Sequence, residues 1–581
     1  MKSRISRLSL GEWIGVAVLA VAVALPLRGL LRYAGPPMEE GFMLVFPERL
    51  LRGDVPNVDF LHLYGPGSLY ALGAIYKLFG AGLTVERLAG LAQELAIVAA
   101  IFWTTRRWGA VLATTSALIA VVLVLTPTGL TALAWDGGVA LGLWAVVLAA
   151  NTVIGLNAAA DADALTTGVR RRLLAAGVLA GLALSFRPDL IIAIGLGAAA
   201  LWWLSSRRVL QRLGVGLVVG LVPILIHLGM AGPFHSLNGM VLDPVFRLRD
   251  GRALPRPPSW NVLDGALQKA GAIRPFAWPL PTIGLPHQVF LFFFILIFST
   301  LFVAAVGLWR ARTDRRDPRA IALCACGAFG LGLLPQALQR PDTTHLAWVG
   351  AVTIALVPVA TYELLTALAG RLDRHQRTAA TEAAPEAVAS NGDRLGRWIT
   401  ALSVMVVPLM LAVAVPSYTL LSYGDVVGQS IGVREHSYAV VRGDRRFYLG
   451  TSEAQQASQA LIADLDRLAK PGQRLFVGTE DLRRTPYSDA FFYHLYPELR
   501  PGTYYIEMDP GMANRPDSGL ADDLANSDFV ILSGFWRVWV EPNASQEDGS
   551  DEPNQVLRDH FCQVGTYGGL LSLYQRCDHT P

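Results

Sequence analysis

Charged residues are scarce in this sequence. Asp, Glu, Lys and Arg make up only 16% of its 581 residues, whereas soluble domains usually contain about 25%. Hydrophobic residues make up 52%, and the mean hydropathy is +0.40. This composition predicts a polytopic membrane protein. The formal net charge of +3 is too small to indicate a nucleic-acid partner.

Several common catalytic motifs are also missing. The sequence has no Walker loop, no GxGxxG after a predicted strand, no HExxH pair and no GxSxG elbow. No internal repeat is visible, although many transporters are built from repeated halves. The sequence therefore gives no sign of a nucleotide site or of the hydrolase and metalloprotease classes that use these motifs.

Only four cysteines are present. Cys324 and Cys326 lie in an apolar run and are expected to be inert packing residues. Cys562 and Cys577 lie near the C-terminus, and they can pair if that segment is outside the membrane, because oxidising compartments permit disulfides. The sequence leaves the pairing open, since it does not show the geometry of the two side chains.

Apolar runs and basic clusters together predict the topology. The first apolar run, 14–31, follows a basic start and is close to the ~20 residues that cross a bilayer, which favours an uncleaved anchor with a cytoplasmic N-terminus. Basic clusters mark further cytoplasmic ends, so the chain between Arg172 and Arg207 must cross twice. Segment 63–80 is expected to be interfacial, because a crossing there would place Arg106 and Arg107 outside. Four further spans are predicted at 84–105, 110–125, 138–154 and 213–230. Three more spans follow, of which the first ends at Arg310, the second leads to Gln339 and the third returns to Arg371. The last predicted span is 398–418.

These spans predict a mainly α fold, a transmembrane bundle of about 11 helices with a small C-terminal extracytoplasmic α/β domain. The transmembrane domain is assigned to 1–420, with a first outer loop at 34–83 and a flexible cytoplasmic linker at 370–397. The extracytoplasmic domain is assigned to 421–581. In it, 452–468 has helical spacing, and RLFVGTED, DFVILSG and VGTYGGLLSLYQR resemble strands. The expected location is the plasma (inner) membrane, crossed many times.

The stretch 38–70 holds the main candidate site. Glu39 and Glu40 are adjacent where the chain leaves the membrane, and Asp59 and His62 follow. A carboxylate pair can serve as a general base, bind a divalent cation such as Mg or Mn, or both, and Asp59 or His62 can tune its basicity. The alternative is a helix-capping or solvated acidic pair at the lipid headgroups.

The tripeptide RPD occurs on two predicted outer turns. Arg187 precedes Asp189, and Arg340 precedes Asp342, with His345 close behind. Guanidinium groups bind phosphate through a bidentate fork, so both arginines are candidates for a phosphate site. The alternative is a local Arg–Asp pair that fixes each turn, and His345 is either functional or structural. Four aromatic residues are candidates for stacking on a sugar: Tyr64, Tyr70, Trp135 and Trp260. For most of them the preferred interpretation is an aromatic belt at the membrane interface.

The stretches MEEGF, LLRGDVPNVDFLHLYGPGSLY and LFGAGLTVERLAG resemble the first periplasmic loop of polytopic glycosyltransferases of the C fold, in particular the protein mannosyltransferase and aminoarabinose transferase-like branch. The resemblance is close over 14–107, looser at SFRPDL and QRPDTTHL, and vague in the C-terminal domain. Such enzymes take a sugar from a polyprenyl-phosphate donor and transfer it outside the cytoplasm to a lipid, glycan or protein. By this resemblance Glu39 falls on the usual catalytic aspartate. Most relatives have Asp-Glu where this chain has Glu-Glu, so either carboxylate remains a candidate base, and metal use varies in the family.

The sequence thus predicts an inverting membrane glycosyltransferase. Glu39 or Glu40 deprotonates an extracytoplasmic acceptor, and Arg187 and Arg340 hold the phosphate of the departing polyprenyl phosphate. No cofactor is required beyond a possible divalent cation at Glu39 and Glu40. The alternatives are a lipid or glycan transporter or flippase, and a non-catalytic membrane scaffold that binds a partner through its outer domain. A polymerase or ligase of lipid-linked glycans is a closer enzymatic variant.

Overall fold

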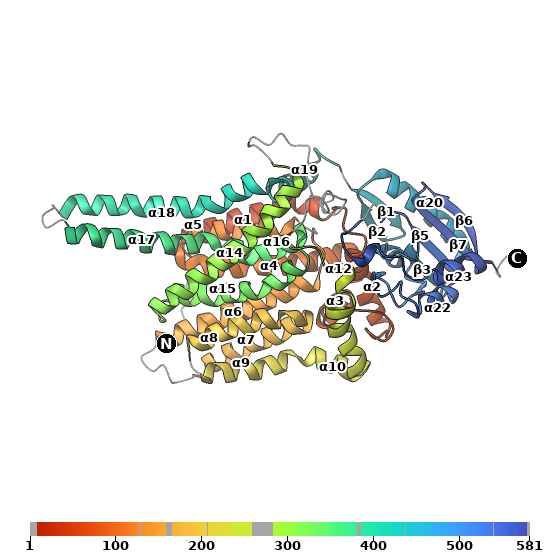
Figure 1. Cartoon of the computed structure of the whole chain (residues 1–581), viewed down its shortest axis with the longest axis horizontal. Coiled ribbons are helices and arrows are strands. Elements are labelled where there is room, and N and C mark those ends of the chain that lie inside the picture. Colours follow the sequence, from red (N-terminus) through yellow and green to blue (C-terminus); the bar gives the residue numbers. More distant parts are fainter. Residues whose placement is uncertain are drawn as a thin grey trace.

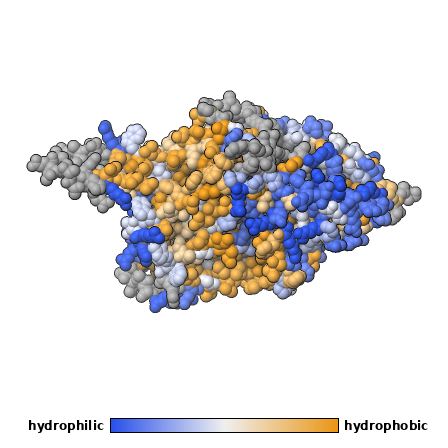
Figure 2. All heavy atoms as spheres, in the orientation of Figure 1, coloured by the Kyte–Doolittle hydropathy of each residue, from blue (hydrophilic) through white to orange (hydrophobic). Residues whose placement is uncertain are grey.

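The computed structural model describes residues 8–126, 129–158, 166–205, 207–257, 280, 283–379, 385–435, 437–537 and 540–577. Figure 1 shows an elongated molecule in which a bundle of helices occupies one end and a mixed α/β domain the other. The hydrophobic surface covers the bundle, whereas the α/β domain is largely hydrophilic (Figure 2). This arrangement confirms the predicted fold class.

Eight described helices are long and apolar enough to cross a membrane, and two shorter apolar helices accompany them. The chain is therefore a multi-pass membrane protein. The helices of the bundle overlap the predicted spans, and two of those spans are each divided between two helices, α9 with α10 and α16 with α17. The helices are α1 Leu10–Leu30, α4 Leu83–Thr105, α5 Ala110–Leu125, α6 Ala134–Asn157, α7 Thr167–Phe186, α8 Ile191–Trp203, α9 Arg207–Gly220, α10 Val222–Ala231, α14 Leu285–Thr313, α15 Pro318–Gln339, α16 Thr343–Thr353, α17 Val357–Ala379 and α18 Pro385–Ala414.

Both RPD tripeptides form the tip of a helical hairpin. Arg187 ends α7 in an extended conformation, with φ −140°, and Pro188 then starts a short 3₁₀ turn that leads into α8. Arg340 ends α15 in the same way, with φ −138°. Proline cannot donate the backbone hydrogen bond that would continue the helix, so each helix stops at its arginine.

The segment expected to be a flexible linker differs from that prediction. Residues 370–379 belong to α17 and residues 385–397 belong to α18, while 380–384 lie outside the described residues. Ala and Glu, which are frequent in this segment, are strong helix formers. Its lack of apolar periodicity therefore did not make it a coil.

The first outer loop contains two helices, α2 (Glu39–Leu51) and α3 (Gly67–Phe79). With 13 residues, α3 is too short to cross a bilayer, which takes about 20. This length agrees with the interfacial position expected for 63–80. A second loop, after α10, forms short helical segments: α11 Pro233–Leu237, η3 Asn238–Arg247 and α12 Arg249–Arg252.

The C-terminal domain contains a five-stranded mixed sheet with the order β4-β3-β5-β7-β6. The central strands β3 and β5 run parallel, and β7 runs antiparallel to both of its neighbours, β5 and β6. A disulfide joins Cys562 to Cys577, and Cys324 and Cys326 are free and buried in the bundle. The described elements are α19 Leu420–Ser430, β1 Tyr438–Arg442, β2 Arg445–Leu449, α20 Ser452–Leu468, β3 Arg474–Thr479, α21 Phe491–Leu495, β4 Arg500–Pro501, α22 Leu520–Ala525, β5 Phe529–Ser533, η6 Ala544–Gln546, α23 Glu552–His560, β6 Phe561–Tyr567 and β7 Leu571–Arg576.

Candidate active site

A cavity lies where the bundle meets the C-terminal domain. Of the residues singled out from the sequence, Glu39, Arg187, Arg340 and His345 all contribute to its wall. They come from the start of α2, the α7–α8 turn, the end of α15 and the start of α16. The other lining residues are Met38, Phe42, Met43, Tyr64, Leu133, Ala134, Trp135, Arg252, Gln336, Trp348, Tyr487 and Glu507.

The two adjacent carboxylates have different surroundings. Glu40 is 1% exposed and forms a bidentate ion pair with Arg87 of α4, with Oε1 2.6 Å from Nε and Oε2 2.7 Å from Nη2. Arg87 also donates to the carbonyl oxygens of Leu30 and Tyr33, so this pair ties α2 to the end of α1. Glu40 is thus occupied, and it is not among the residues that line the cavity.

Glu39 lines the cavity and is partly buried. Within the described part of the chain, no arginine or lysine forms an ion pair with it. Burial raises the pKa of its carboxyl above the ordinary value, while its own backbone N–H and the charges of Arg340 and Arg252 act against this shift. A desolvated carboxylate that is not neutralised by a close cation is a stronger base than one in water.

Arg187 is held at one edge of the cavity. Its Nε donates to Asp189 Oδ1 at 2.8 Å and its Nη2 to Asp189 Oδ2 at 2.6 Å, so the local pair foreseen as an alternative does form. The guanidinium also lies 4.6 Å from the ring centroid of Tyr64 and 5.2 Å from that of Trp135. These two aromatics therefore belong to the cavity rather than to an interfacial belt, whereas Trp260 lies outside the described residues.

Arg340 is more fully occupied. Its Nε donates to Asp342 at 2.9 Å, and its Nη1 donates to the carbonyl oxygen of Arg252 and to Glu541, each at 2.9 Å. Its Nη2 also pairs with Glu541. Most of its N–H donors are thus used within the protein, so fewer of them remain for a phosphate ligand than the sequence predicted.

His345 is oriented by Asp342. Asp342 caps α16 by accepting from the backbone N–H of His345 at 2.9 Å, and its carboxylate is also 2.8 Å from His345 Nδ1. The imidazole stands edge-on against Trp348, with ring centroids 5.0 Å apart. This arrangement fixes the ring in the wall of the cavity.

Asp59 and His62 are not brought to the cavity. Asp59 is exposed and accepts from the backbone N–H of Val55 at 2.6 Å, so it shapes the loop. His62 is 1% exposed and stands edge-on between Phe46 and Tyr64. Burial lowers its pKa to about 3, so it is a neutral core residue.

The sequence did not identify the residues that other segments contribute to the site. Arg252 comes from α12, and its Nη2 approaches Glu507 Oε2 at 3.3 Å and Asp509. Glu507 is 2% exposed, and burial together with Asp509 raises its pKa to about 8. Tyr487 donates to Glu541 at 3.3 Å. The C-terminal domain therefore forms one wall of the cavity.

Helix α2 is also fixed directly to the C-terminal domain. Glu48, near its end, lies 2.7 Å from Nη1 of Arg445 in the β1–β2 hairpin. Gly41 lies against the backbone of α21, and a Cβ added at Gly41 would be 2.7 Å from the nitrogen of Phe491. A side chain at position 41 would force α2 away from this domain.

A divalent cation does not fit the carboxylates that the sequence suggested for it. Glu40 is already neutralised by Arg87, so Glu39 and Glu40 do not form a chelating pair. Within the described ranges, no three His, Cys, Asp or Glu side chains gather closely enough to hold a metal ion.

Comparisons with known proteins add the following. No protein-family profile matches the chain, and no curated sequence matches it. Among solved structures, the chain is similar to ArnT from Cupriavidus metallidurans bound to undecaprenyl phosphate, with 14% identity over 97% of this chain and 98% of that chain and a TM-score of 0.51. It is also similar to the oligosaccharyltransferase AglB from Archaeoglobus fulgidus in complex with an inhibitory peptide and a dolichol-phosphate, with 11% identity over 98% of this chain and 75% of that chain and a TM-score of 0.47.

The structure of ArnT is matched over nearly the whole of both chains, from the membrane helices through the C-terminal domain. At this level of identity the match concerns the fold and not the substrate. The chain has the fold of the polytopic C-type glycosyltransferases, the group that its first outer loop resembles.

Proposed function

We propose that this protein is an inverting membrane glycosyltransferase that moves a sugar from a polyprenyl-phosphate donor to an acceptor outside the cytoplasm. One observation carries the proposal. The Glu39 carboxylate, without a paired cation, shares a cavity with the guanidinium of Arg187 and with the aromatic rings of Tyr64 and Trp135. A base, a cation and stacking surfaces are the groups that transfer from a sugar phosphate requires.

In the proposed reaction, the acceptor hydroxyl attacks the anomeric carbon of the donor while Glu39 takes the hydroxyl proton. The bond between the anomeric carbon and the phosphate oxygen breaks, and its electron pair leaves with the polyprenyl phosphate. Attack opposite the leaving group inverts the anomeric configuration. Phosphate is a sufficient leaving group, so no metal step is included.

The arginines have different roles in this scheme. Arg187 binds a phosphate oxygen directly, because Asp189 and Gln336 accept from its Nε and Nη2 groups only, and the Nη1 group has no hydrogen bond within the described residues. Arg252 also lines the cavity, and its buried Nε has no hydrogen-bond partner among the described residues. Arg340 is held by Glu541 and Asp342, and it contributes positive charge and positions the α15–α16 turn.

The proposal is tested by the lipids that the protein binds. Protein purified in mild detergent is expected to carry a lipid-linked sugar that mass spectrometry can identify, and to bind added undecaprenyl phosphate. Glu39→Gln should bind undecaprenyl phosphate normally and transfer sugar from the identified donor about 10²–10⁴-fold more slowly than the wild type. If the purified protein binds no polyprenyl phosphate, or if Glu39→Gln turns over at the wild-type rate, the proposal is wrong.

A further inference from the structure

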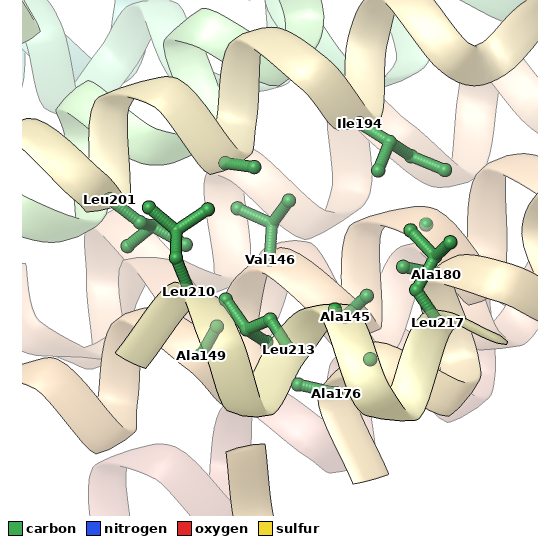
Figure 3. Close-up of a pocket in the computed structure, with 14 residues that line it drawn as sticks. Ala145, Val146, Ala149, Ala176, Ala180, Ile194, Leu201, Leu210, Leu213 and Leu217 are labelled. Atoms are coloured by element: carbon green, nitrogen blue, oxygen red, sulfur yellow. The ribbon is translucent and has the colours of Figure 1, made fainter. Parts of the chain in front are cut away.

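A second cavity lies inside the bundle, away from the candidate active site. It has a volume of about 130 Å³ and is surrounded by α6, α7, α8 and α9. Figure 3 shows that the labelled side chains around it carry only carbon atoms. An apolar cavity of about 150 Å³ stays dry and accepts apolar ligands. A cavity with this apolar lining therefore favours a hydrocarbon ligand.

The shape of this cavity follows from small residues. Gly177 in α7 and Gly216 in α9 bring the two backbones together, since a Cβ on either residue would lie 2.1 or 2.2 Å from a carbonyl oxygen of the other helix. Glycine is the residue that allows such close crossings in membranes. Beside this crossing, Ala176 and Ala180 face Ile194 and Leu201 of α8 across the space (Figure 3). The span that contains α9 is largely unburied, so the cavity lies next to the lipid.

Four arginines lie on α7 and α9, close in sequence to residues that line the cavity. Arg172 is one helical turn before Ala176, a rise of about 6 Å, and Arg212 lies between the lining residues Leu210 and Leu213. Arg170 and Arg171 precede Arg172 at the start of α7. All four side chains are exposed, and none forms an ion pair within the described part of the chain.

The cavity is closer to these arginines than to the candidate active site. Ala180, at its other end, is seven residues before Arg187, a rise of about 10 Å along α7. Figure 1 shows the start of α9 at the end of the bundle that is far from the C-terminal domain. A lipid whose phosphate lies at Arg187 thus approaches from the opposite end.

We propose that this end of the bundle binds an anionic phospholipid, with its phosphate at Arg170, Arg171, Arg172 and Arg212 and one acyl chain in the cavity between α6, α7, α8 and α9. Guanidinium groups bind phosphate oxygens, and basic pockets between membrane helices bind anionic headgroups. The apolar cavity directly beside them takes the chain. This site is independent of the proposed glycosyl transfer.

The test is a titration of the purified full-length protein with phosphatidylglycerol, followed by native mass spectrometry and by thermal unfolding, with phosphatidylcholine as the neutral comparison. Arg172→Gln with Arg212→Gln should weaken phosphatidylglycerol binding roughly fivefold for each arginine removed. The matched control is Arg312→Gln with Arg316→Gln, which removes the same charge from the exposed last turn of α14 and the turn that follows it. Equal weakening in both double variants would mean that the basic surface attracts lipid without a site, and the proposal would be overturned.

The acyl chain is tested separately. Ala176→Leu fills part of the cavity and should weaken binding of dioleoyl phosphatidylglycerol more than that of the dihexanoyl form, whose chains are short. Ala180→Val is a milder filling variant in case the first does not fold. If both variants leave phosphatidylglycerol binding unchanged, or instead raise the KM for a long-chain polyprenyl donor, the cavity does not hold a phospholipid chain.

Discussion

Glu40→Gln tests whether Glu40 is a structural carboxylate, as its pair with Arg87 indicates, and not the proposed base. Glu40 and Arg87 are each 1% exposed and are joined by two hydrogen bonds of 2.6 and 2.7 Å. Removing one partner of a buried ion pair costs about 3–5 kcal/mol, because the other charge stays buried without compensation. Glutamine keeps one oxygen as an acceptor, so we expect a loss near the lower end, about 3 kcal/mol.

The assay is thermal unfolding of the purified protein, combined with a transfer assay on the same samples. Glu40→Gln should unfold at a lower temperature and keep its turnover below that temperature. Arg87→Met in the Glu40→Gln background should recover much of the loss, since an apolar side chain of similar length removes the uncompensated charge. Glu39→Gln is the matched control and should unfold normally while losing about 10²–10⁴-fold in turnover.

Two results would refute this reasoning. A Glu40→Gln variant with the wild-type unfolding temperature would show that the pair with Arg87 does not stabilise α2. A Glu40→Gln variant that unfolds normally but is inactive, beside an active Glu39→Gln variant, would assign the base to Glu40 instead.

Three further predictions follow from the site and the outer domain. Arg187→Ala should raise the KM for the lipid donor about ten- to hundredfold, because a charge-assisted hydrogen bond contributes about 1.5–3 kcal/mol. Arg247→Ala, outside the cavity, should leave this KM unchanged. Equal KM values for the two variants would exclude Arg187 from the phosphate site. The proposed base, Glu39, must be a carboxylate to take a proton, and burial raises its pKa above the ordinary value of 4.5. The kcat/KM should therefore fall on acidification with a midpoint above 4.5. A midpoint at or below 4.5 would contradict the role of Glu39 as the base. Reducing the Cys562–Cys577 disulfide, which spans 15 residues, should lower the free energy of unfolding of the C-terminal domain by about 3 kcal/mol. Denaturant titration with and without reductant measures this difference, and an unchanged midpoint would show that the bond contributes little.

The sequence predicted the elements that depend on local pattern. Apolar runs located the membrane helices because a bilayer demands about 20 apolar residues for each crossing. The two RPD turns were located because proline ends a helix, and both arginines do reach one cavity. Helices α17 and α18 extend into the segment predicted as a linker, since its Ala-rich and Glu-rich composition favours helix as much as disorder.

The partners of the site residues were not predictable in this way. Glu507 and Tyr487 reach the cavity from a domain that begins some four hundred residues after Glu39, and no spacing in the sequence reports that contact. The choice between Glu39 and Glu40 depends on Arg87, whose pairing is visible only once α2 and α4 are placed side by side. His62 was expected to tune the base, but it is enclosed by Phe46 and Tyr64 instead.

The contact between Glu48 and Arg445 has a mechanical consequence. Glu48 and Glu39 belong to the same helix and are nine residues apart, about 13 Å along its axis. Helix α2 is thus held at both ends, by Arg87 of α4 beside Glu39 and by Arg445 of the β1–β2 hairpin at Glu48. The position of the Glu39 carboxylate in the cavity therefore depends on the membrane bundle and on the C-terminal domain together.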